Sequence, residues 1–413
     1  MNPLLNREHL PLAQSYVSSN KINKGDTMKE ACIKEFENYN DVVREIEICR
    51  KYGRDYTIEK GMVEKFINRL HPAQMKLKVA DVIAETSSAS TLRLVSENGY
   101  LPPFQAGQYV SISLEAGGIR TSRPYSISSP PNQTGYYDLT IKRVEDGLIS
   151  NYLLDHVKRD DFLTCSGPTG NFYHNPLFHS RSMVCIAGGS GITPFMSMIQ
   201  EIADCGLNLN VILLYGNRTL EEAIFHNRLN AISNRFNNIR YYPVLETPPK
   251  GYKGYTGFIT AQLIKNAVGD STDKTFYICG PQGIYDFCIP ELTQIGVLKK
   301  KIRTEVYAPS SERITDQPGW PKNVNSDDQF KVKMNNGKTF SVRAGEPLLK
   351  SLEKNGIVVP SQCRAGQCSY CRVKIVSGKV FQPEGTPVRR SDSRFGYVHS
   401  CVSYPLENLE ILI

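Results

Sequence analysis

Four of the eleven cysteines lie near the C-terminus with a spacing suited to an iron–sulfur centre. Cys363, Cys368 and Cys371 fall within nine residues, and Cys401 follows thirty residues later. A tight loop can bring three thiolates to one side of a metal centre, and a distant segment can supply the fourth. The C-x4-C-x2-C…C pattern is that of a [2Fe–2S] cluster, whereas four-cysteine zinc sites more often contain two C-x2-C pairs. The sequence therefore predicts a [2Fe–2S] cluster with these four cysteines as ligands.

A second group of residues could bind a flavin. In Arg123-Pro-Tyr125-Ser126 the guanidinium can neutralise a phosphate, the ring can stack on isoalloxazine and the hydroxyl can reach the flavin edge. Gly147 and Ser150 open a helical stretch, and the free amides of a helix N-terminus suit a pyrophosphate. The candidate flavin-binding residues are Arg123, Tyr125, Ser126, Ile141, Lys142, Gly147 and Ser150.

Three further segments could bind a pyridine nucleotide. A glycine-rich turn follows one predicted strand and opens a helix, so its amides can approach a pyrophosphate with the helix dipole assisting. Alone, this turn could equally be a plain tight turn. Two other segments, around Asn217 and around Cys279, each follow a later predicted strand. The candidate nucleotide-binding residues are Gly188, Gly189, Gly191, Thr193, Asn217, Arg218, Cys279, Gly280 and Pro281.

The elements that must position these residues change in character along the chain. The N-terminal part shows apolar residues at helical spacing behind a capping box at Thr27-Met-Lys-Glu30, and Cys32 and Cys49 are expected to be small core residues there. Short β-rich segments then predict an antiparallel barrel, and alternating strands and helices predict a doubly wound parallel sheet. The predicted units of this multidomain α+β chain are a helical extension (1–74), a β-barrel domain (75–178), an α/β domain (179–308), a linker (309–328) and a C-terminal domain (329–413).

The order of these motifs resembles that of the ferredoxin–NADP reductase superfamily. The resemblance implies that Arg123 and Ser150 contact flavin phosphate, that Tyr125 stacks on the flavin and that Ser126 lies near its N5 atom. It also implies that Cys279 lies beside the nicotinamide and that Glu305 closes the pocket near the flavin. The implied catalytic residues are Ser126, Cys279 and Glu305. Some members with a C-terminal ferredoxin carry FMN, but the Gly147-x-x-Ser150 element favours FAD.

The last 85 residues resemble plant-type ferredoxins well beyond the cysteines, in Cys371-Arg-Val-Lys-Ile and His399-Ser-Cys-Val. This implies a β-grasp [2Fe–2S] domain. From Asp327 onward there are 13 Lys and Arg residues against 8 Asp and Glu residues, and a basic face would favour an acidic partner. The domain order resembles that of oxygenase reductase components and of the NADH oxidoreductase that serves hydroxylamine reductase. Residues 1–74 have no obvious counterpart in those proteins.

The three predicted sites together indicate an electron-transfer function. A hydride carries two electrons and a [2Fe–2S] cluster accepts one, so a flavin between them resolves the mismatch. We expect an NAD(P)H-dependent oxidoreductase that passes single electrons to a separate acceptor protein, such as an oxygenase, a hybrid cluster protein or a corrinoid protein. The alternatives are direct reduction of a small molecule and a subunit of a larger redox complex. NADH and NADPH both remain open, because Arg218 could hold a 2′-phosphate while Glu221 or Glu222 could bind a free ribose hydroxyl.

Composition excludes several other classes of protein. No stretch of about 18 apolar residues predicts a membrane span. The N-terminus lacks the features of a secretory signal, so a cytoplasmic location is expected. The formal charge of +8 is modest for 413 residues, and no basic block with interleaved aromatic residues predicts nucleic-acid binding.

Overall fold

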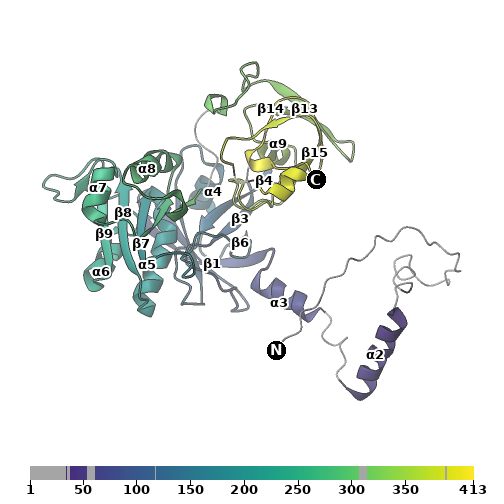
Figure 1. The fold of residues 1–413 in the computed structure, drawn as a ribbon, viewed down its shortest axis with the longest axis horizontal. Helices are drawn as coiled ribbons and strands as arrows, with labels where there is room; N and C mark the ends of the chain where they lie inside the picture. Colours follow the sequence, from purple (N-terminus) through teal and green to yellow (C-terminus); the bar gives the residue numbers. More distant parts are fainter. Residues whose placement is uncertain (1–33, 35–37, 54–60, 117, 307–313, 387) are drawn as a thin grey trace, which may run out of the picture. The chain divides into compact units, whose positions relative to one another are not determined.

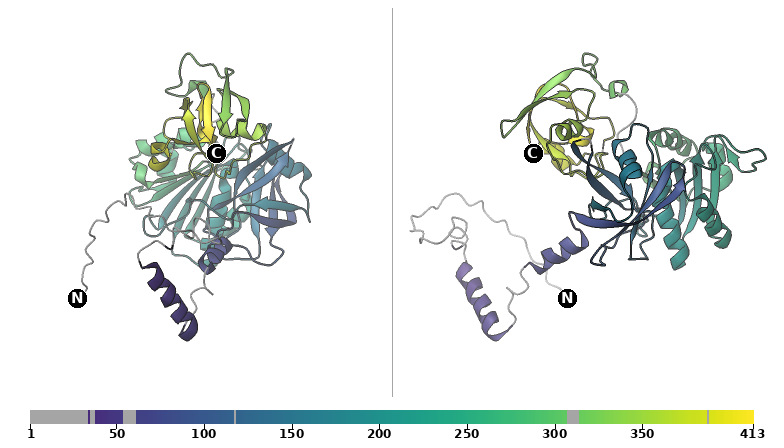
Figure 2. Two further views of the ribbon diagram at one scale, coloured as in Figure 1. Left: turned by 90° about the vertical axis from the view of Figure 1, so that its right-hand side faces the viewer. Right: turned by 180° about the vertical axis from the view of Figure 1, so that it is seen from behind.

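The computed structural model describes residues 34, 38–53, 61–116, 118–306, 314–386 and 388–413 (Figures 1 and 2). The chain divides into two compact units, residues 1–66 and residues 67–413. Three large β-sheets and one two-stranded sheet lie in the second unit. Within the described ranges, no helix is both long and apolar enough to cross a membrane.

Two helices precede the sheets, α2 (Tyr39–Tyr52) and α3 (Met62–Leu70). Neither contains a buried residue, and Cys49 is only half-buried. The prediction that Cys49 is a small core residue is therefore wrong. α3 ends just before His71-Pro72, as predicted, because the residue before a proline disfavours helical geometry. The predicted capping box at Thr27 and the thiol of Cys32 lie outside the described residues.

The first large sheet is the predicted antiparallel barrel. Its strand order is β4-β3-β6-β1-β2-β5, and a bridge between Ile127 and Leu139 joins the end of β4 to β5. Alternate side chains such as Leu92 and Leu94 point inward and are fully buried, which stabilises the fold by roughly 1.5–3 kcal/mol for each such side chain. The elements are β1 (Met75–Thr86), β2 (Ala89–Val95), β3 (Tyr109–Ala116), β4 (Ile119–Ser126), β5 (Tyr137–Lys142), α4 (Leu148–His156) and β6 (Phe162–Cys165).

The second large sheet is the predicted doubly wound α/β domain. All six strands are parallel, in the order β10-β9-β8-β7-β11-β12. Helices α5 and α6 cover one face of the sheet, and α7 and α8 cover the other (Figure 1). The strands are β7 (Ser182–Gly188), β8 (Asn210–Asn217), β9 (Ile239–Leu245), β10 (Tyr255–Thr256), β11 (Thr275–Cys279) and β12 (Ile302–Glu305). The helices are η1 (Gly189–Ile192), α5 (Thr193–Cys205), α6 (His226–Arg235), α7 (Ala261–Val268), α8 (Gln282–Gln294) and η2 (Lys299–Lys301).

The third large sheet is mixed and lies in the C-terminal domain. Its order is β14-β13-β19-β15-β17, with β13 and β19 parallel and the other pairs antiparallel. Three leucines of α9 pack into its core, which confirms the predicted β-grasp fold. Its strands are β13 (Gln329–Met334), β14 (Thr339–Arg343), β15 (Arg372–Ser377), β16 (Val380–Phe381), β17 (Tyr397–His399), β18 (Tyr404–Pro405) and β19 (Leu409–Leu412). The helices from residue 314 onward are η3 (Ile314–Asp316), α9 (Leu348–Lys354), α10 (Arg390–Arg394) and η4 (Ser400–Val402).

The topology of the parallel sheet places its functional residues at one edge. The chain begins in the centre at β7, adds β8, β9 and β10 on one side, and then adds β11 and β12 on the other. The strand order therefore reverses between β7 and β11, and ligands of open α/β sheets bind beyond the carboxyl ends of the strands at such a point. The glycine-rich turn directly follows β7.

Candidate functional site

The four predicted cluster cysteines lie as two pairs. A hydrogen bond joins the thiols of Cys363 and Cys368, and another joins Cys371 and Cys401. These bonds lower the pKa of Cys368 to about 6 and that of Cys371 to about 7. No three His, Cys, Asp or Glu side chains of the described residues surround a single metal position. Two pairs of thiolates suit the two irons of a [2Fe–2S] cluster, whereas a zinc ion needs four ligands around one point.

The backbone of the cluster loop is shaped to donate hydrogen bonds to sulfur. The amides of Ala365, Gln367 and Cys368 point at Sγ of Cys363 over 3.3–3.4 Å. Gly366 has a φ of 77°, and a Cβ there would lie 3.0 Å from a Val402 methyl carbon. Such amide–sulfur bonds stabilise a thiolate and tune the potential of a bound cluster. The loop therefore fits the cluster that its spacing predicts.

A buried histidine is hydrogen-bonded to this loop. His399 is fully buried, and its Nδ1 donates to the Gly366 carbonyl over 2.6 Å. Its Nε2 lies 3.1 Å from a carboxylate oxygen of Asp392, and this hydrogen bond lowers the pKa of Asp392. The contact ties α10 to the cluster loop.

The predicted flavin residues lie at the ends of β4 and β5 and at the start of α4. Arg123 donates to Thr121 Oγ1 and to the Ser122 carbonyl and forms no ion pair with any residue that the structure describes. Burial, and then repulsion from Arg364, lowers the pKa of Arg123 to about 10. A half-buried cation that forms no such ion pair fits a site for a phosphate group.

The other flavin candidates occupy positions compatible with their predicted roles. Tyr125 is half-buried on β4, and Ser126 is buried at the end of that strand. A Cβ on Gly147 would lie 2.9 Å from the Val144 carbonyl oxygen, so this tight start of α4 favours glycine. Ile141 and Lys142 end β5, with Ile141 in the barrel core and Lys142 partly exposed.

The nucleotide candidates converge at the carboxyl edge of the parallel sheet. In register, Ala187 at the end of β7 pairs with Cys279 of β11, and Cys279 pairs with Glu305 of β12. A Cβ on Gly191 would lie 2.0 Å from the Cys279 carbonyl oxygen, so the turn and β11 approach each other closely. The amide atoms of Asn217 are buried at the end of β8, beside the hydroxyl of Tyr215.

The remaining nucleotide candidates surround this edge. Gly188 ends β7 and pairs with Gly216, Gly189 begins η1, and Thr193 begins α5 with its hydroxyl on the Ser190 carbonyl. Gly280 and Pro281 lead from β11 into α8, and the Gly280 amide donates to Tyr285. Arg218 follows β8 and is exposed.

Glu305 is the most strongly perturbed carboxyl group of the site. Its side chain is 5 % exposed, and burial raises its pKa well above the usual value. Its Oε2 atom has no hydrogen-bond partner. The backbone carbonyl of the same residue accepts a hydrogen bond from Tyr285. Burial thus favours the neutral form of this carboxyl group at the end of β12.

One packed cluster joins the three sites, and the sequence did not reveal it. Tyr109, Cys363 and Ala365 are buried together, and Val306 and Cys368 pack against them. Tyr109 lies opposite Ser126 in the β3–β4 register, and Val306 directly follows Glu305. Tyr109 belongs to the barrel, Val306 to the parallel-sheet domain and the cysteines to the cluster loop. The three candidate sites therefore meet within residues 67–413.

The comparisons with known proteins agree with this arrangement. A model of the oxidoreductase FAD-binding domain matches residues 74–174, and one of the oxidoreductase NAD-binding domain matches residues 185–289. A model of the 2Fe-2S iron-sulfur cluster binding domain matches residues 332–406. The barrel, the parallel sheet and the C-terminal sheet thus each correspond to one known domain.

Several characterised proteins are similar over most of the chain. The glycine betaine monooxygenase reductase subunit of Pseudomonas aeruginosa is 28% identical over 341 residues, which cover 80% of this chain and 92% of that protein. The NADH oxidoreductase HCR of Escherichia coli is 29% identical, over 81% of this chain and 96% of that protein. NADH-cytochrome b5 reductase 1 of Dictyostelium discoideum is 30% identical, over 60% of this chain and 86% of that protein. The chain belongs to the ferredoxin–NADP reductase superfamily.

This reductase is an NAD(P)H-dependent oxidoreductase of the reductase-component type. It has FAD-binding, NAD-binding and [2Fe–2S]-binding domains and transfers electrons from NAD(P)H to the cluster. Its fold is also that of phthalate dioxygenase reductase, with a TM-score of 0.60 and 22% identity over 82% of this chain and 98% of that one.

A polar clamp fixes the cluster loop of the reductase against its barrel. Arg364 forms a buried ion pair with Glu353 and donates to Thr121 Oγ1 of β4 over 2.7 Å. Beside it, the hydroxyl of Ser122 lies 3.0 Å from that of Ser361. Thr121 Oγ1 therefore accepts from both Arg364 and Arg123. A motif search misses this clamp because its partners are 243 residues apart in sequence.

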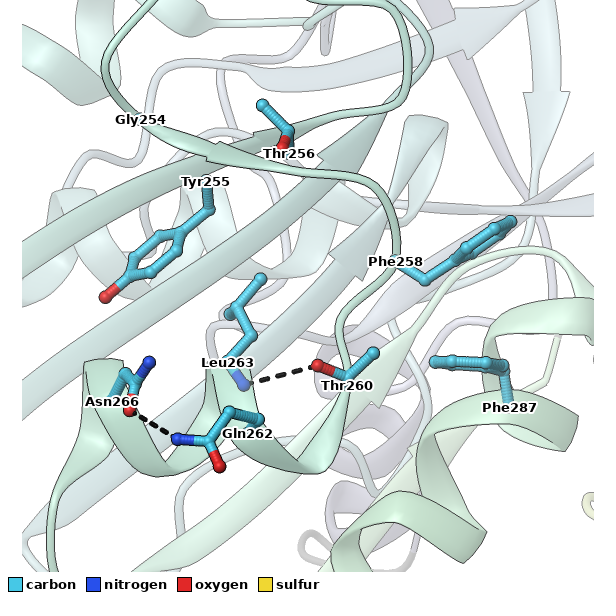
Figure 3. Close-up of a pocket in the computed structure, with 9 residues that line it drawn as sticks. All are labelled: Gly254, Tyr255, Thr256, Phe258, Thr260, Gln262, Leu263, Asn266 and Phe287. Atoms are coloured by element: carbon cyan, nitrogen blue, oxygen red, sulfur yellow. Dashed lines mark hydrogen bonds between the residues drawn. The ribbon is translucent and has the colours of Figure 1, made fainter.

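A surface pocket of about 430 Å³ lies in the NAD-binding domain and is formed by β10, α7 and α8 (Figure 3). Phe258 and Phe287 face each other at one end, and Tyr255 and Asn266 lie at the other (Figure 3). It contains none of the predicted site residues, so we do not assign it to the redox site.

The buried carboxyl of Glu305 leads to a prediction about stability. Its pKa is higher in the folded than in the unfolded protein, so its contribution to stability falls as pH rises above about 4.3. Glu305→Gln cannot ionise and should therefore gain stability relative to the wild type between pH 5 and pH 8. We expect its melting temperature at pH 8 to be higher by roughly 2–4 °C, which corresponds to about 1 kcal/mol.

Thermal unfolding at pH 5, 6, 7 and 8 measures this difference. The control is Glu97→Gln, which makes the same change at an exposed carboxylate. The raised pKa of Glu305 would be contradicted if the difference in melting temperature between Glu305→Gln and the wild type stayed constant or shrank with rising pH.

Proposed function

We propose that the reductase takes hydride from NADH and delivers electrons one at a time to a separate acceptor protein. The packed contact of Tyr109, Val306 and Cys363 carries this proposal, because it brings barrel, nucleotide domain and cluster loop together. When bound, FAD accepts a two-electron hydride and releases single electrons, and the cluster accepts them singly. The role of the chain is to hold donor and acceptor groups in a fixed geometry, which supplies most of the rate.

The proposed residue roles follow from the charge and burial at each position. Arg123 and the start of α4 at Gly147 and Ser150 hold the flavin phosphates, and the Tyr125 ring covers the flavin. Ser126, Cys279 and Glu305 line the junction between flavin and nicotinamide, with Glu305 holding a proton. The proposed cluster ligands are Cys363, Cys368, Cys371 and Cys401. The proposed nucleotide contacts are Gly188, Gly189, Gly191, Thr193, Asn217, Arg218, Cys279, Gly280 and Pro281.

The same reasoning supports the division of the chain at 75–178, 179–308 and 329–413 as three working domains. Each proposed domain contains one large sheet and overlaps one family match. We further propose that the acceptor is an oxygenase component. Two similar proteins are named as reductase subunits of glycine betaine monooxygenase and of stachydrine N-demethylase. Similarity to the E. coli NADH oxidoreductase HCR makes an acceptor of the hybrid cluster type the second candidate.

Anaerobic NADH consumption tests the need for an acceptor protein. Without one, the purified reductase should oxidise about 1.5 equivalents of NADH, which fills a two-electron flavin and a one-electron cluster, and then stop. Adding an excess of the oxidised oxygenase component should then cause further NADH oxidation, in proportion to the number of electrons that its redox centres accept. Sustained oxidation with a small-molecule substrate alone would instead support a self-contained reductase.

A carboxylate at the predicted coenzyme site favours NADH over NADPH. Arg218 donates to Glu222 from Nε and Nη2, over 3.0 and 2.7 Å. Lys142 of β5 lies 3.9 Å from the same carboxylate. Arg218 is thus already paired, and Glu222 can accept from a free ribose hydroxyl but repels a 2′-phosphate.

Glu222→Gln should therefore reduce the preference for NADH. We expect the ratio of kcat/KM for NADH to that for NADPH to fall about tenfold, which is 1.4 kcal/mol and is typical of one hydrogen bond to a charged group. Glu221→Gln is the matched control, because its carboxylate is exposed and bonds Thr219 and its own backbone. An unchanged ratio in Glu222→Gln, or an equal fall in the control, would remove Glu222 from coenzyme selection.

A further inference from the structure

The outer face of the [2Fe–2S] domain is strongly basic. Residues 363–403 contain seven Lys and Arg residues against two acidic ones, Glu384 and Asp392. Arg364 is buried against the barrel, and Asp392 is the buried residue of α10. The exposed cations of this stretch include Arg372, Arg389, Arg390 and Arg394.

This basic face is continuous with the cluster loop. Asp392 points inward from α10, bonds His399 and lies 3.8 Å from Arg372, which directly follows the ligand Cys371. Arg390 and Arg394 are two residues before and after Asp392. Side chains two positions away on a helix lie on the opposite side, so both arginines point outward when Asp392 points inward.

The positive charge of α10 is not neutralised within the protein. Arg389, Arg390 and Arg394 form no ion pair with any residue in the described ranges. The carboxylate of Asp392 faces His399, and Glu384 is the other acidic residue of this stretch. A cluster of unpaired cations creates a field that attracts acidic surfaces and speeds their association.

Two exposed aromatic residues lie close to these arginines in the sequence. Tyr370, between two cluster cysteines, is 52 % exposed, and Phe395, at the end of α10, is 67 % exposed. Cys363 and Ala365 are buried against Tyr109 of the barrel, and Tyr370 lies near the same tyrosine. The exposed part of Tyr370 remains open to a partner, and aromatic residues ringed by charges are typical of binding sites for proteins.

We infer that Tyr370, Arg372, Arg389, Arg390, Arg394 and Phe395 form the docking surface for the acceptor, which is a protein with an acidic patch around its redox centre. The inference rests on the proposed function and adds the chemistry of the partner. Electrons would enter the cluster from the flavin side at Tyr109 and leave on the side of α10, which is tied to the cluster loop through Asp392 and His399. The basic charge would set both the affinity and the rate of encounter.

The test compares Arg390→Glu/Arg394→Glu with Lys299→Glu/Lys300→Glu, which makes the same charge change at exposed lysines of η2. The probes are cytochrome b5, an acidic acceptor of one electron, and cytochrome c, a basic one. We expect the α10 variant to bind cytochrome b5 at least about tenfold more weakly and to reduce it at least about tenfold more slowly at low salt. Cytochrome c reduction should not fall, the η2 variant should resemble the wild type, and salt should weaken wild-type binding to cytochrome b5.

Two results would overturn the inference. One is equal affinity of the wild type and the α10 variant for cytochrome b5. The other is binding to vesicles of phosphatidylserine and phosphatidylcholine that the α10 variant loses while its affinity for cytochrome b5 is unchanged, since this would assign the face to a membrane. Reduction of flavin and cluster by NADH is recorded for each protein first. If the wild-type cluster stays oxidised, the proposed function fails. The binding measurement still tests whether this surface binds an acidic protein.

Discussion

Replacing Cys363 by serine should abolish electron transfer to an acceptor protein while leaving reduction of the flavin by NADH intact. The sulfur of Cys363 accepts hydrogen bonds from three backbone amides and is hydrogen-bonded to Cys368. Its loss therefore removes a proposed cluster ligand and the acceptor of these loop hydrogen bonds. Cluster ligands hold the iron directly, and even outer contacts of metal sites are worth about 10–100-fold. We therefore expect a fall of at least about 100-fold in cytochrome c reduction.

Stopped-flow absorbance of the flavin and steady-state reduction of cytochrome c measure the two halves of this prediction. Cys205→Ser is the control, since that thiol is exposed and lies at the end of α5. Loss of flavin reduction together with acceptor reduction would contradict the proposed order of electron transfer. Retention of both would exclude the cluster from the route.

Gly191→Ala should block the entry of electrons instead of their exit. A Cβ at this position would lie 2.0 Å from the carbonyl oxygen and 2.3 Å from the carbonyl carbon of Cys279. Backbone atoms cannot rotate away as the end of a flexible side chain can, so the turn and the end of β11 must move apart by about 1 Å. A displacement of that size in a reacting pair costs about 100-fold in rate. We expect the rate of flavin reduction by NADH to fall by this factor.

Dithionite separates a specific defect from unfolding in this experiment. It should reduce the flavin and the cluster of Gly191→Ala as in the wild type, because it needs no nucleotide site. Gly135→Ala is the control, since a Cβ there meets no atom within 4 Å. A rate with NADH within threefold of the wild type would show that the close approach at Gly191 does not matter for hydride transfer.

Much of the fold could be predicted because local patterns were strong. Alternation in the barrel strands and apolar runs in β7, β8 and β11 are set by burial on one or both faces of a sheet. β12 lacks such a pattern, since Ile302-Arg-Thr-Glu305 contains one apolar residue. These four residues form a strand because they pair with the edge of β11. Nothing in their own sequence indicates that pairing.

In the N-terminal extension, the sequence pattern led to a wrong prediction. Cys49 lies near an apolar helical face and is predicted to be a core residue, yet α2 contains no buried residue. Periodicity shows that a helix has an apolar side, but it does not show what covers that side.

The candidate site could be predicted residue by residue but not as an assembly. Each motif lies within one loop, so short-range spacing was sufficient to find the cluster cysteines and the glycine-rich turn. The contacts that join them link Arg364 to Thr121 and Cys363 to Tyr109, between residues more than 240 apart in sequence. A single sequence gives no signal for such pairs. The choice between Arg218 and Glu222 likewise needed the observation that the two side chains are bonded to each other.

An anaerobic titration with NADH, followed by flavin absorbance and by EPR of the cluster, tests the central claim most directly. The account predicts that NADH bleaches the flavin and that the signal of a reduced [2Fe–2S] cluster grows in the same titration. A flavin that is fully reduced beside an intact cluster that stays oxidised would contradict it, because the junction at Tyr109, Val306 and Cys363 would then not connect the two centres.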